Sequence, residues 1–303
     1  MELFLQQVIN GLTIGAFYAV VALGYTMVYG VLKLINFAHG DMFMWGTLIG
    51  FWALDALLGL LAGLDLVAIL MAAVLSMGLI ALIGMGIERI AYRPLRTAGR
   101  LSPVISALGA AFVLESVARN ATGASYEVYP QTSLNSLPSL RLGSSLQISG
   151  LQIIVFVISV LLMVALYLFV QRTRLGTAMR AVSINHDVSR LMGINVDRII
   201  TLVFLIGPAL GAAAGMMVGI YYGSFDFSLG WVFGLKAFIA AILGGIGNIP
   251  GAVLGGFLLG LVEALGAGYI SASWKDAIAY ALLIIILIVR PTGILGETQA
   301  EKV

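Results

Sequence analysis

Long, nearly uncharged apolar runs dominate this chain. Each run holds about 20 residues, the length that an α-helix needs to cross the hydrocarbon core of a bilayer. Because the apolar residues are continuous rather than alternating, we expect helices and not strands. The predicted crossings are residues 5–32, 40–62, 66–88, 102–122, 151–170, 200–222, 229–247, 252–270 and 275–290. The pattern predicts an all-α polytopic membrane protein with about 8–10 transmembrane helices in one domain, residues 1–303, the count depending on broken or re-entrant segments.

Composition agrees with a lipid environment. Hydrophobic residues make up 61% of the 303 residues and charged residues 10%, with a mean hydropathy of +1.07, which water-soluble domains of this length do not normally show. The absence of cysteine excludes disulfides, thiolate metal sites and cysteine nucleophiles, and two histidines are too few for a histidine-rich metal site. No G-x-x-x-x-G-K-[ST] motif is present, so we expect this chain to bind no nucleotide.

Basic residues concentrate in two loops and predict the orientation. Arginine and lysine favour the cytoplasmic side of a membrane, so both loops are predicted to be cytoplasmic. The segment 123–150 carries only Glu127 and Arg141 and is predicted to be the external loop. We expect the N-terminus outside, the C-terminus inside the cytoplasm and no cleaved signal peptide. The loop arginines are Arg89, Arg93, Arg96 and Arg100 after the third run, and Arg172, Arg174, Arg180, Arg190 and Arg198 after the fifth.

Two stretches interrupt the apolar runs, one in each half of the chain. They are residues 36–41, with the sequence NFAHGD, and residues 244–251, with the sequence GGIGNIPG. Paired interruptions of this kind are typical of inverted-topology repeats around a central pathway. Two ordinary glycine-rich turns are the alternative interpretation.

Small residues recur at four-residue steps in two of the predicted helices. Such spacing places them on one face of a helix, where they permit close helix–helix contact in lipid. We therefore expect both stripes to pack against other helices rather than to bind substrate. The first comprises Gly207, Gly211, Gly215, Gly219 and Gly223, and the second comprises Gly256, Gly260, Ala264 and Gly268.

Several ionisable residues fall within predicted spans, where each needs a partner, a cavity or a role in the pathway. Lys236 and Glu263 lie in neighbouring runs and are predicted to form a buried ion pair, the alternative being a role with substrate. Glu115 and Arg119 are four residues apart and are expected to neutralise each other. The candidates are His39, Asp41, Glu115, Lys236 and Glu263.

Glu88 and Arg89 are adjacent at the predicted edge of the third span. Long charged side chains at such an edge commonly extend toward the lipid headgroups. We therefore expect Glu88 to reach the membrane surface.

The polar loop 171–199 is too polar to span a membrane. Its apolar residues Ala178, Val182, Leu191 and Met192 suggest short helices that lie across the membrane face. Such a surface would dock a soluble partner. An ordinary basic loop that only fixes the topology is the alternative.

Motifs in this loop and elsewhere carry a family resemblance. Residues 187–193, DVSRLMG, resemble a degenerate form of the E-A-A-x-x-x-G loop through which ABC permeases contact their ATPase subunits. This segment and four others closely resemble the LivH-like permeases of branched-chain amino acid importers. The other four are GTAMRAV (176–182), RLMGINVDRI (190–199), LINFAHGDM (34–42) and AAILGGIGNIPGAVLGG (240–256). The resemblance extends over about residues 8–295. Permeases for urea or short amides share much of it.

The resemblance implies a transport subunit and not an enzyme. Its fold would be similar to that of vitamin B12-type ABC importer permeases, with an inverted-repeat core. It would move Leu, Ile or Val by alternating access, with a LivM-like second permease, two cytoplasmic ATPase subunits and a periplasmic amino-acid-binding protein as partners. ATP would bind to the ATPase subunits, and this chain would bind neither a cofactor nor nucleic acid.

Site residues follow from the same resemblance. Asn36 and Asp41 also have a structural alternative, because either side chain suits the cap of a helix. Gly193 is expected to end a short helix, and Arg180 to offer an ion pair to the ATPase. The expected pathway residues are Asn36, His39, Asp41, Gly245, Gly247 and Asn248, and the expected coupling residues are Arg180, Asp187 and Gly193.

Other function classes explain less of the sequence. A secondary transporter driven by an ion gradient would account for the composition, the helix breaks and the buried charges, but not for a docking loop. A channel would need a pore loop that the sequence does not repeat. A membrane enzyme would need a catalytic constellation that the sequence lacks.

Overall fold

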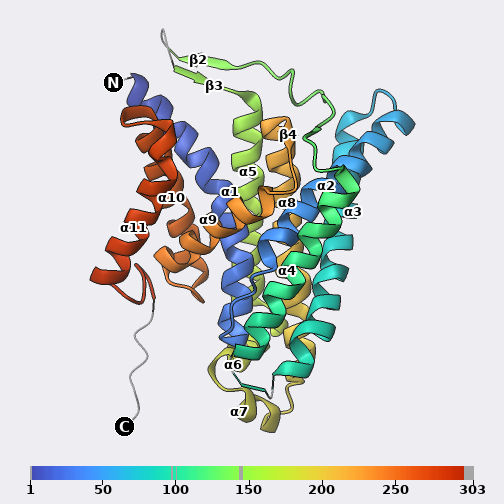
Figure 1. Ribbon diagram of the computed structural model, residues 1–303, viewed down its shortest axis with the longest axis vertical. Coiled ribbons are helices and arrows are strands. Elements are labelled where there is room, and N and C mark those ends of the chain that lie inside the picture. The colour runs from blue at the N-terminus through green and yellow to red at the C-terminus, as the bar shows by residue number, and fades with distance from the viewer. Residues whose placement is uncertain (1, 97, 100, 143–145, 297–303) are drawn as a thin grey trace.

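The computed structural model of the chain describes residues 2–96, 98–99, 101–142 and 146–296 and is mainly helical (Figure 1). Eight spans in this part of the chain are long and apolar enough to cross a membrane, which confirms the predicted fold class. They are built on α1 (Glu2–Leu32), α2 (His39–Leu60), α3 (Asp65–Ile87), α4 (Leu101–Thr122), α5 (Gly150–Arg172), α8 (Val196–Tyr222), α10 (Ile249–Tyr269) and α11 (Lys275–Val289). Arg100, which the sequence placed in the first basic loop, lies outside the described residues.

The predicted crossing at 229–247 is wrong as a full span. The helix found there, α9 (Leu229–Gly244), has only 16 residues. At 1.5 Å per residue it is about 24 Å long, which is less than the hydrocarbon thickness of a bilayer. It is therefore a half-helix that begins inside the bundle.

Shorter elements lie at the two ends of the bundle. Two further helices, α6 (Arg174–Ile184) and α7 (His186–Leu191), form one end, and a hairpin of β2 (Leu140–Leu142) and β3 (Leu146–Ile148) forms the other, beside the start of α1 (Figure 1). A second strand pair joins β1 (Glu127–Val128) to β4 (Ser224–Phe225), with Glu127 opposite Phe225. The last turn of α11 points toward the end that holds α6 and α7 (Figure 1). The basic segments 88–96 and 172–198 therefore lie at one end of the bundle, and the described part of the loop 123–149 lies at the other.

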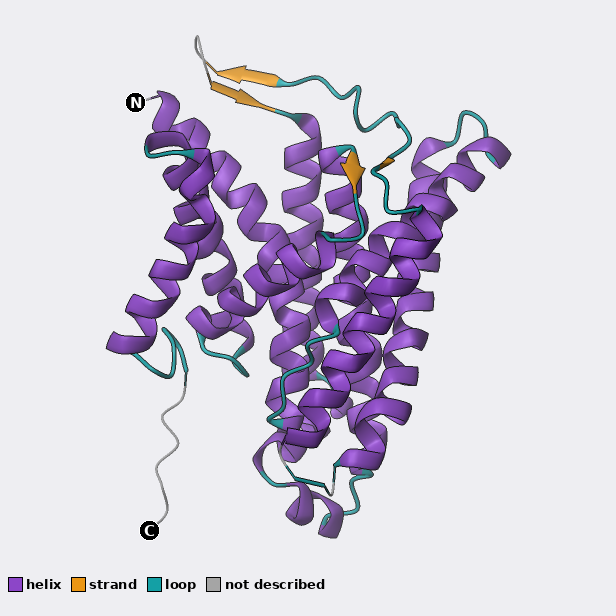
Figure 2. Ribbon diagram, in the orientation of Figure 1, coloured by secondary structure: helices purple, strands orange, loops and turns teal. Residues whose placement is uncertain are grey.

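Helices α1–α4 and α8–α11 form two units that run through the bundle in opposite directions (Figure 1). In each unit a long first helix is followed by an irregular link that turns back into the bundle, and the two links enter from opposite ends (Figure 2). The links are residues 33–38 and 223–228. The counterpart of the early break is therefore residues 223–228, and the prediction that paired it with residues 244–251 is wrong.

Glycine faces bring the central helices α1 and α8 close to their neighbours. A Cβ added to Gly256 or Gly260 of α10 would collide with the backbone of α1. On α8, a Cβ at Gly215 would collide with the Phe43 carbonyl oxygen of α2, and one at Gly219 with the Tyr129 ring. Gly215, Gly256 and Gly260 thus lie in helix–helix contacts, where close backbone approach increases dispersion contact in lipid, whereas Gly219 lies against a loop residue and an added Cβ at Gly223 would meet nothing within 4 Å. Gly207 lies against Gly24 of α1, with the Gly24 carbonyl oxygen 3.3 Å from an added Cβ.

The loop 123–149 is anchored to the bundle through one aromatic side chain. Tyr129 is 2% exposed, and its hydroxyl donates a hydrogen bond to the Thr47 carbonyl oxygen at 2.7 Å. Burial raises the pKa of the Tyr129 phenol well above its usual value, so the hydroxyl remains a donor at physiological pH. The described part of the loop is therefore held against α2 and α8.

Local sequence signals explain several element boundaries. Ser149 and Gln152 form a capping box at the start of α5, and the Asn195 side chain accepts a hydrogen bond from the Arg198 N–H at the start of α8. Gly223, with a φ of 72°, ends α8 in the left-handed conformation. Helix α8 continues through Pro208.

Candidate translocation and coupling sites

The N-termini of α2 and α9 meet inside the bundle. A Cβ on Gly40 would lie 2.8 Å from the Gly234 Cα atom, and one on Gly230 would lie 2.9 Å from the Gly40 carbonyl oxygen. Helix N-termini carry unpaired N–H groups and a partial positive charge. The crossing of α2 and α9 therefore places polar backbone in the interior of a membrane bundle, which is typical of transporter pathways.

The early pathway residues Asn36, His39 and Asp41 lie at or just before the start of α2 and are buried. The His39 Nε2 atom lies 3.2 Å from the Val21 carbonyl oxygen, and its ring packs edge-on against Tyr25 with 4.7 Å between centroids. The Asn36 Oδ1 atom accepts a hydrogen bond from the Tyr92 hydroxyl at 3.1 Å. Within the described residues, the Asn36 Nδ2 and His39 Nδ1 atoms have no hydrogen-bond partner. The start of α2 thus contains buried polar nitrogen atoms that form no hydrogen bond within the described fold.

Asp41 lies in the first turn of α2 and is 7% exposed. No cationic side chain lies within 4.0 Å of its carboxylate in the described part of the chain. The partly positive N-terminus of α2 offsets part of the cost of burying this carboxylate. Helix α2 starts after Ala38 with no side-chain cap, so the expectation that Asn36 or Asp41 caps this helix is wrong.

The late pathway residues lie elsewhere, in the turn between α9 and α10. The Asn248 Oδ1 atom caps α10 by accepting from the Gly251 N–H at 2.9 Å, and its Nδ2 atom donates to the Leu295 carbonyl oxygen. Gly245 and Gly247 have φ values of 105° and 100°. This turn packs against the end of α1 and the segment 293–296 and not against the crossing of α2 and α9. The structure does not bring the two predicted groups together.

A buried charge cluster joins α1, α9, α10 and α11. The Lys236 Nζ atom lies 2.7 Å from Glu263 Oε1 and 2.7 Å from Asp276 Oδ1, which confirms the predicted ion pair. The Tyr18 hydroxyl donates to Glu263 Oε2 at 2.7 Å. Lys275 is more loosely attached, with its Nζ atom 3.7 Å from Glu263 Oε1. Sequence reasoning missed Tyr18, Lys275 and Asp276 because nothing in their local pattern pointed to a partner on another helix.

A cavity of about 270 Å³ adjoins this cluster, beside residues 7–14 of α1 and the start of α11. Its charged wall consists of Glu263 and Lys275, and Tyr222 also lines it. Ile14 and Ala267 supply apolar surface. The cavity therefore combines both signs of charge with an aliphatic lining.

Two other predictions about charged residues are wrong. Glu88 does not extend to the membrane surface: it is fully buried, pairs with Arg96 and accepts a hydrogen bond from the Thr201 hydroxyl at 3.1 Å. The guanidinium of Arg96, which folds back over the helix end, satisfies the carboxylate inside the protein. Glu115 and Arg119 form no ion pair, and Arg119 instead lies 5.5 Å from the centre of the Phe227 ring.

The coupling residues all lie on α6, α7 or the turn after them. Arg180 donates to the Gln171 side chain at 2.7 Å, and Asp187 lies 3.5 Å from Arg190. Gly193 follows the end of α7 with a φ of 81°, and its N–H donates to the Arg190 carbonyl oxygen. Gly193 thus occupies a position that residues with a Cβ rarely adopt.

Helices α6 and α7 expose apolar side chains at the end of the molecule. Ile184 and Leu191 are each 86% exposed, and Met192 is 77% exposed. At the same time the His186 Nε2 atom lies 2.8 Å from the Val31 carbonyl oxygen near the end of α1. An exposed apolar surface that is tied to a central helix is suited to receive a partner and to transmit its motion.

The family model described as "Branched-chain amino acid transport system / permease component" matches residues 7–287. The chain belongs to this permease family. Among its relatives, the high-affinity branched-chain amino acid transport system permease protein BraD of Pseudomonas aeruginosa is 46% identical, covering 99% of this chain and 98% of BraD. The corresponding LivH protein of Escherichia coli K12 is 42% identical with the same coverage. The probable LivH permease of Methanocaldococcus jannaschii is 26% identical over 91% of this chain and 87% of its own length.

These findings confirm the resemblance that the sequence motifs indicated. The relatives of this branched-chain amino acid permease are described as transport permeases and not as enzymes. Their similarity extends over both units of the fold, the loop 123–149 and the α6–α7 region.

Proposed function

We propose that this permease is the membrane subunit of an ABC importer that carries Leu, Ile or Val across a bacterial inner membrane. Two cytoplasmic ATPase subunits would supply ATP binding and hydrolysis, a LivM-like second permease would complete the membrane part, and a periplasmic binding protein would deliver substrate. Membership of the permease family supports the substrate class. The exposed apolar surface of α6 and α7 is the observation that supports dependence on a soluble partner.

The orientation follows from the basic residues at the α6–α7 end. Arginines at this end would face the cytoplasm, which places the β2–β3 hairpin and the N-terminus in the periplasm and the C-terminus in the cytoplasm. The ATPases would then dock on α6 and α7, with Arg180 and Asp187 at the contact. Motion of α7 would reach α1 through His186 and reach α8 through the turn at Gly193.

The crossing of α2 and α9 is the proposed gate of the pathway. Asn36, His39 and Asp41 are buried in this conformation, so substrate would reach them only when α9 moves relative to α2. The turn that contains Gly245, Gly247 and Asn248 would serve as the rigid end of α9 during this motion, because hydrogen bonds tie it to residues 293–296.

The cavity beside Glu263 and Lys275 favours an amino acid over urea or a short amide. A zwitterion presents one carboxylate and one ammonium group, and this cavity offers one cation and one anion beside aliphatic side chains. Urea and neutral amides carry no formal charge that could pair with either group. We propose that substrate passes through this cavity after release from the binding protein.

Replacing Gly193 with Val is expected to uncouple the transporter. A β-branched residue at a φ of 81° is strained by roughly 1–2 kcal/mol, so the end of α7 should shift. We expect membrane insertion to be retained, and substrate-stimulated ATPase activity of the assembled complex to fall several-fold. Asp187→Arg, which places a cation beside Arg190, should have the same effect.

Gly63→Val is the matched control, because Gly63 has a φ of 86° and equally open surroundings in the loop between α2 and α3. Equal coupling in Gly193→Val and Gly63→Val would remove α7 from the mechanism.

Replacing Lys275 with Met is expected to raise the KM of leucine uptake about fivefold, the equivalent of about 1 kcal/mol for one partly exposed charged contact. The fold should be unaffected, because the Lys275 side chain is 45% exposed and only loosely attached to Glu263. Uptake by proteoliposomes at saturating binding protein measures the effect. Lys33→Met removes the same charge at the opposite end and should leave KM unchanged. An unaltered KM in Lys275→Met would exclude this cavity from the pathway.

A further inference from the structure

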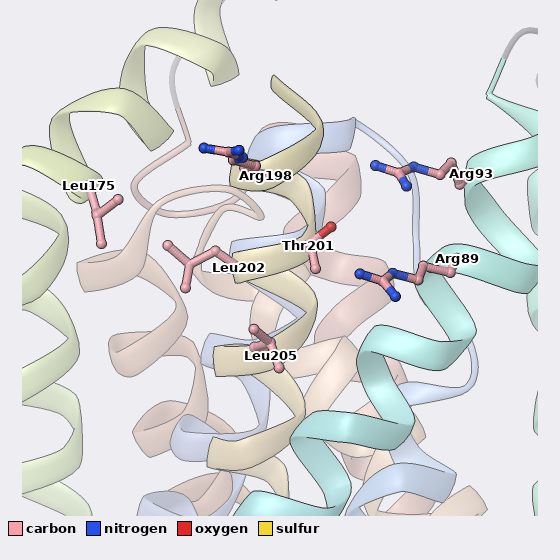
Figure 3. Close-up of a pocket in the computed structure, with 7 residues that line it drawn as sticks. All are labelled: Arg89, Arg93, Leu175, Arg198, Thr201, Leu202 and Leu205. Atoms are coloured by element: carbon pink, nitrogen blue, oxygen red, sulfur yellow. The ribbon is translucent and has the colours of Figure 1, made fainter. Parts of the chain in front are cut away.

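A second cavity of about 330 Å³ lies at the α6–α7 end of the bundle, on the flank of α8 (Figure 3). One wall is the π-helical segment η1 (Glu88–Tyr92), which continues α3, and the following turn η2 (Arg93–Leu95). The guanidinium groups of Arg89 and Arg93 extend from this wall toward α8, on which Arg198 and Thr201 lie (Figure 3). The cavity is therefore bordered by three arginines from three elements, η1, η2 and α8.

The charges around this cavity do not balance. Arg89, Arg93, Arg96 and Arg198 supply four positive charges, and Glu88 and Asp197 supply two negative charges, which leaves an excess of two. Arg96 bonds to both carboxylates, and Arg93 lies 3.9 Å from Glu88 and 3.7 Å from Asp197. Arg89 and Arg198 are exposed and have no ion-pair partner among the described residues. Two free guanidinium groups at one cavity are suited to bind an anionic oxyacid such as a phosphate.

The rest of the cavity is apolar and leads toward the membrane interior. Leu202 and Leu205 are spaced i,i+3 on α8, so they continue along the same face from Arg198 into the spanning part of the helix. Leu175, at the start of α6, is 48% exposed and forms the opposite side. A soluble anion would need only the arginines. A phosphate with attached acyl chains would also cover the leucines, and Arg89 lies two residues beyond Ile87, the last residue of the spanning helix α3.

We propose that this cavity binds the headgroup phosphate of an anionic phospholipid, with its acyl chains along Leu202 and Leu205. Basic pockets between membrane helices are suited to such headgroups. The lipid contacts η1, α6 and α8 together, so it bridges the end of α3 to the helices that lead into the coupling region. The site is separate from the cavity beside Glu263 and from the crossing of α2 and α9, and its occupancy does not depend on which substrate the permease carries.

Native mass spectrometry of the full-length chain with added phosphatidylglycerol or phosphatidylcholine tests the proposal. The double variant Arg89→Gln/Arg198→Gln should bind phosphatidylglycerol with roughly one tenth or less of the affinity of the parent chain, as expected when two arginines near a membrane surface are lost. Phosphatidylcholine binding should remain weak in both. The double variant Arg172→Gln/Arg174→Gln removes two exposed arginines from the same end and should bind phosphatidylglycerol normally. Thermal unfolding of both variants should match that of the parent chain, because the four side chains are exposed.

Three results would overturn the proposal. Equal phosphatidylglycerol binding by the two double variants would show that the cavity does not select the lipid. Displacement of the lipid by millimolar inorganic phosphate would identify a site for a free anion. Normal lipid binding by Arg89→Gln/Arg198→Gln together with lost co-purification of the ATPase subunits would assign the arginines to an acidic surface of that partner.

Discussion

Gly215→Leu is expected to lower the free energy of unfolding by about 3 kcal/mol or more, the upper range for overpacking a tightly packed interior. A Cβ at this position would collide with the Phe43 carbonyl oxygen and lie 2.7 Å from the Thr47 Oγ1 atom and 3.0 Å from the Thr47 amide nitrogen. Backbone atoms of α2 cannot move aside as a flexible side chain can. The larger residue should therefore separate α8 from α2 and disrupt the crossing of α2 and α9.

Leucine substitutions at two other glycines provide the comparison for this result. Gly78→Leu on α3 is the control, since nothing lies within 4 Å of an added Cβ there, and leucine favours helix over glycine. Gly211→Leu should be intermediate, because the nearest atom to its added Cβ is the His39 Cε1 atom at 3.4 Å. Thermal unfolding of the purified chain in detergent gives the ranking. If Gly215→Leu unfolds at the same temperature as Gly78→Leu, the glycine stripe does not hold α8 against α2.

Lys236→Met is expected to destabilise the protein by about 3–5 kcal/mol, the usual cost of removing one partner of a buried ion pair. The side chains of Lys236 and Glu263 are each 5% exposed, so the remaining carboxylate would be poorly hydrated, with the Lys275 Nζ atom at 3.7 Å as its remaining cationic neighbour. The Tyr18 hydroxyl still donates to Glu263 but carries no charge to neutralise it. Removal of the ammonium group should thus loosen the packing of α9, α10 and α1.

A double-mutant cycle separates the ion pair from simple loss of packing. Lys236→Met/Glu263→Gln should recover much of the stability lost in Lys236→Met, because the uncompensated charge is removed. Lys275→Met should be nearly neutral, since Lys275 lies 3.7 Å from Glu263 and is 45% exposed. Urea or thermal unfolding in detergent measures each corner of the cycle. Strict additivity of the two single changes would show that Lys236 and Glu263 do not stabilise each other.

Hydrophobic length and charge placement predicted most of the membrane architecture. Runs of about 20 apolar residues located the eight long spans, because lipid admits few other structures. The same rule misjudged residues 229–247, since an apolar run that is buried between other helices need not cross the membrane. The glycines of that region permit close approach to α2, as the contact between Gly40 and Gly234 shows, and only the tertiary structure reveals the half-helix.

Side-chain partners were harder to predict than helices. Lys236 and Glu263 were matched correctly because lipid strongly penalises unpaired charges and few candidates were available. The environment of Glu88 was predicted wrongly because neither partner is apparent from the local sequence. Arg96 lies just after the helical segment η2, and Thr201 lies on the distant helix α8. The early break was paired with the glycine-rich turn at 244–251, whereas its true counterpart begins at Gly223, where a short polar link leads into α9. Glycine content alone does not distinguish a tight surface turn from a re-entrant segment.

Reconstitution tests the proposed ABC importer most directly. Proteoliposomes would contain this permease with its second permease and the ATPase subunits, and radiolabelled leucine would be offered with the binding protein on the outside. We predict uptake that requires ATP at the ATPase subunits and stops when these subunits are omitted. Leucine accumulation by this chain alone, driven by an imposed ion gradient without ATP, would contradict the account and identify a secondary transporter.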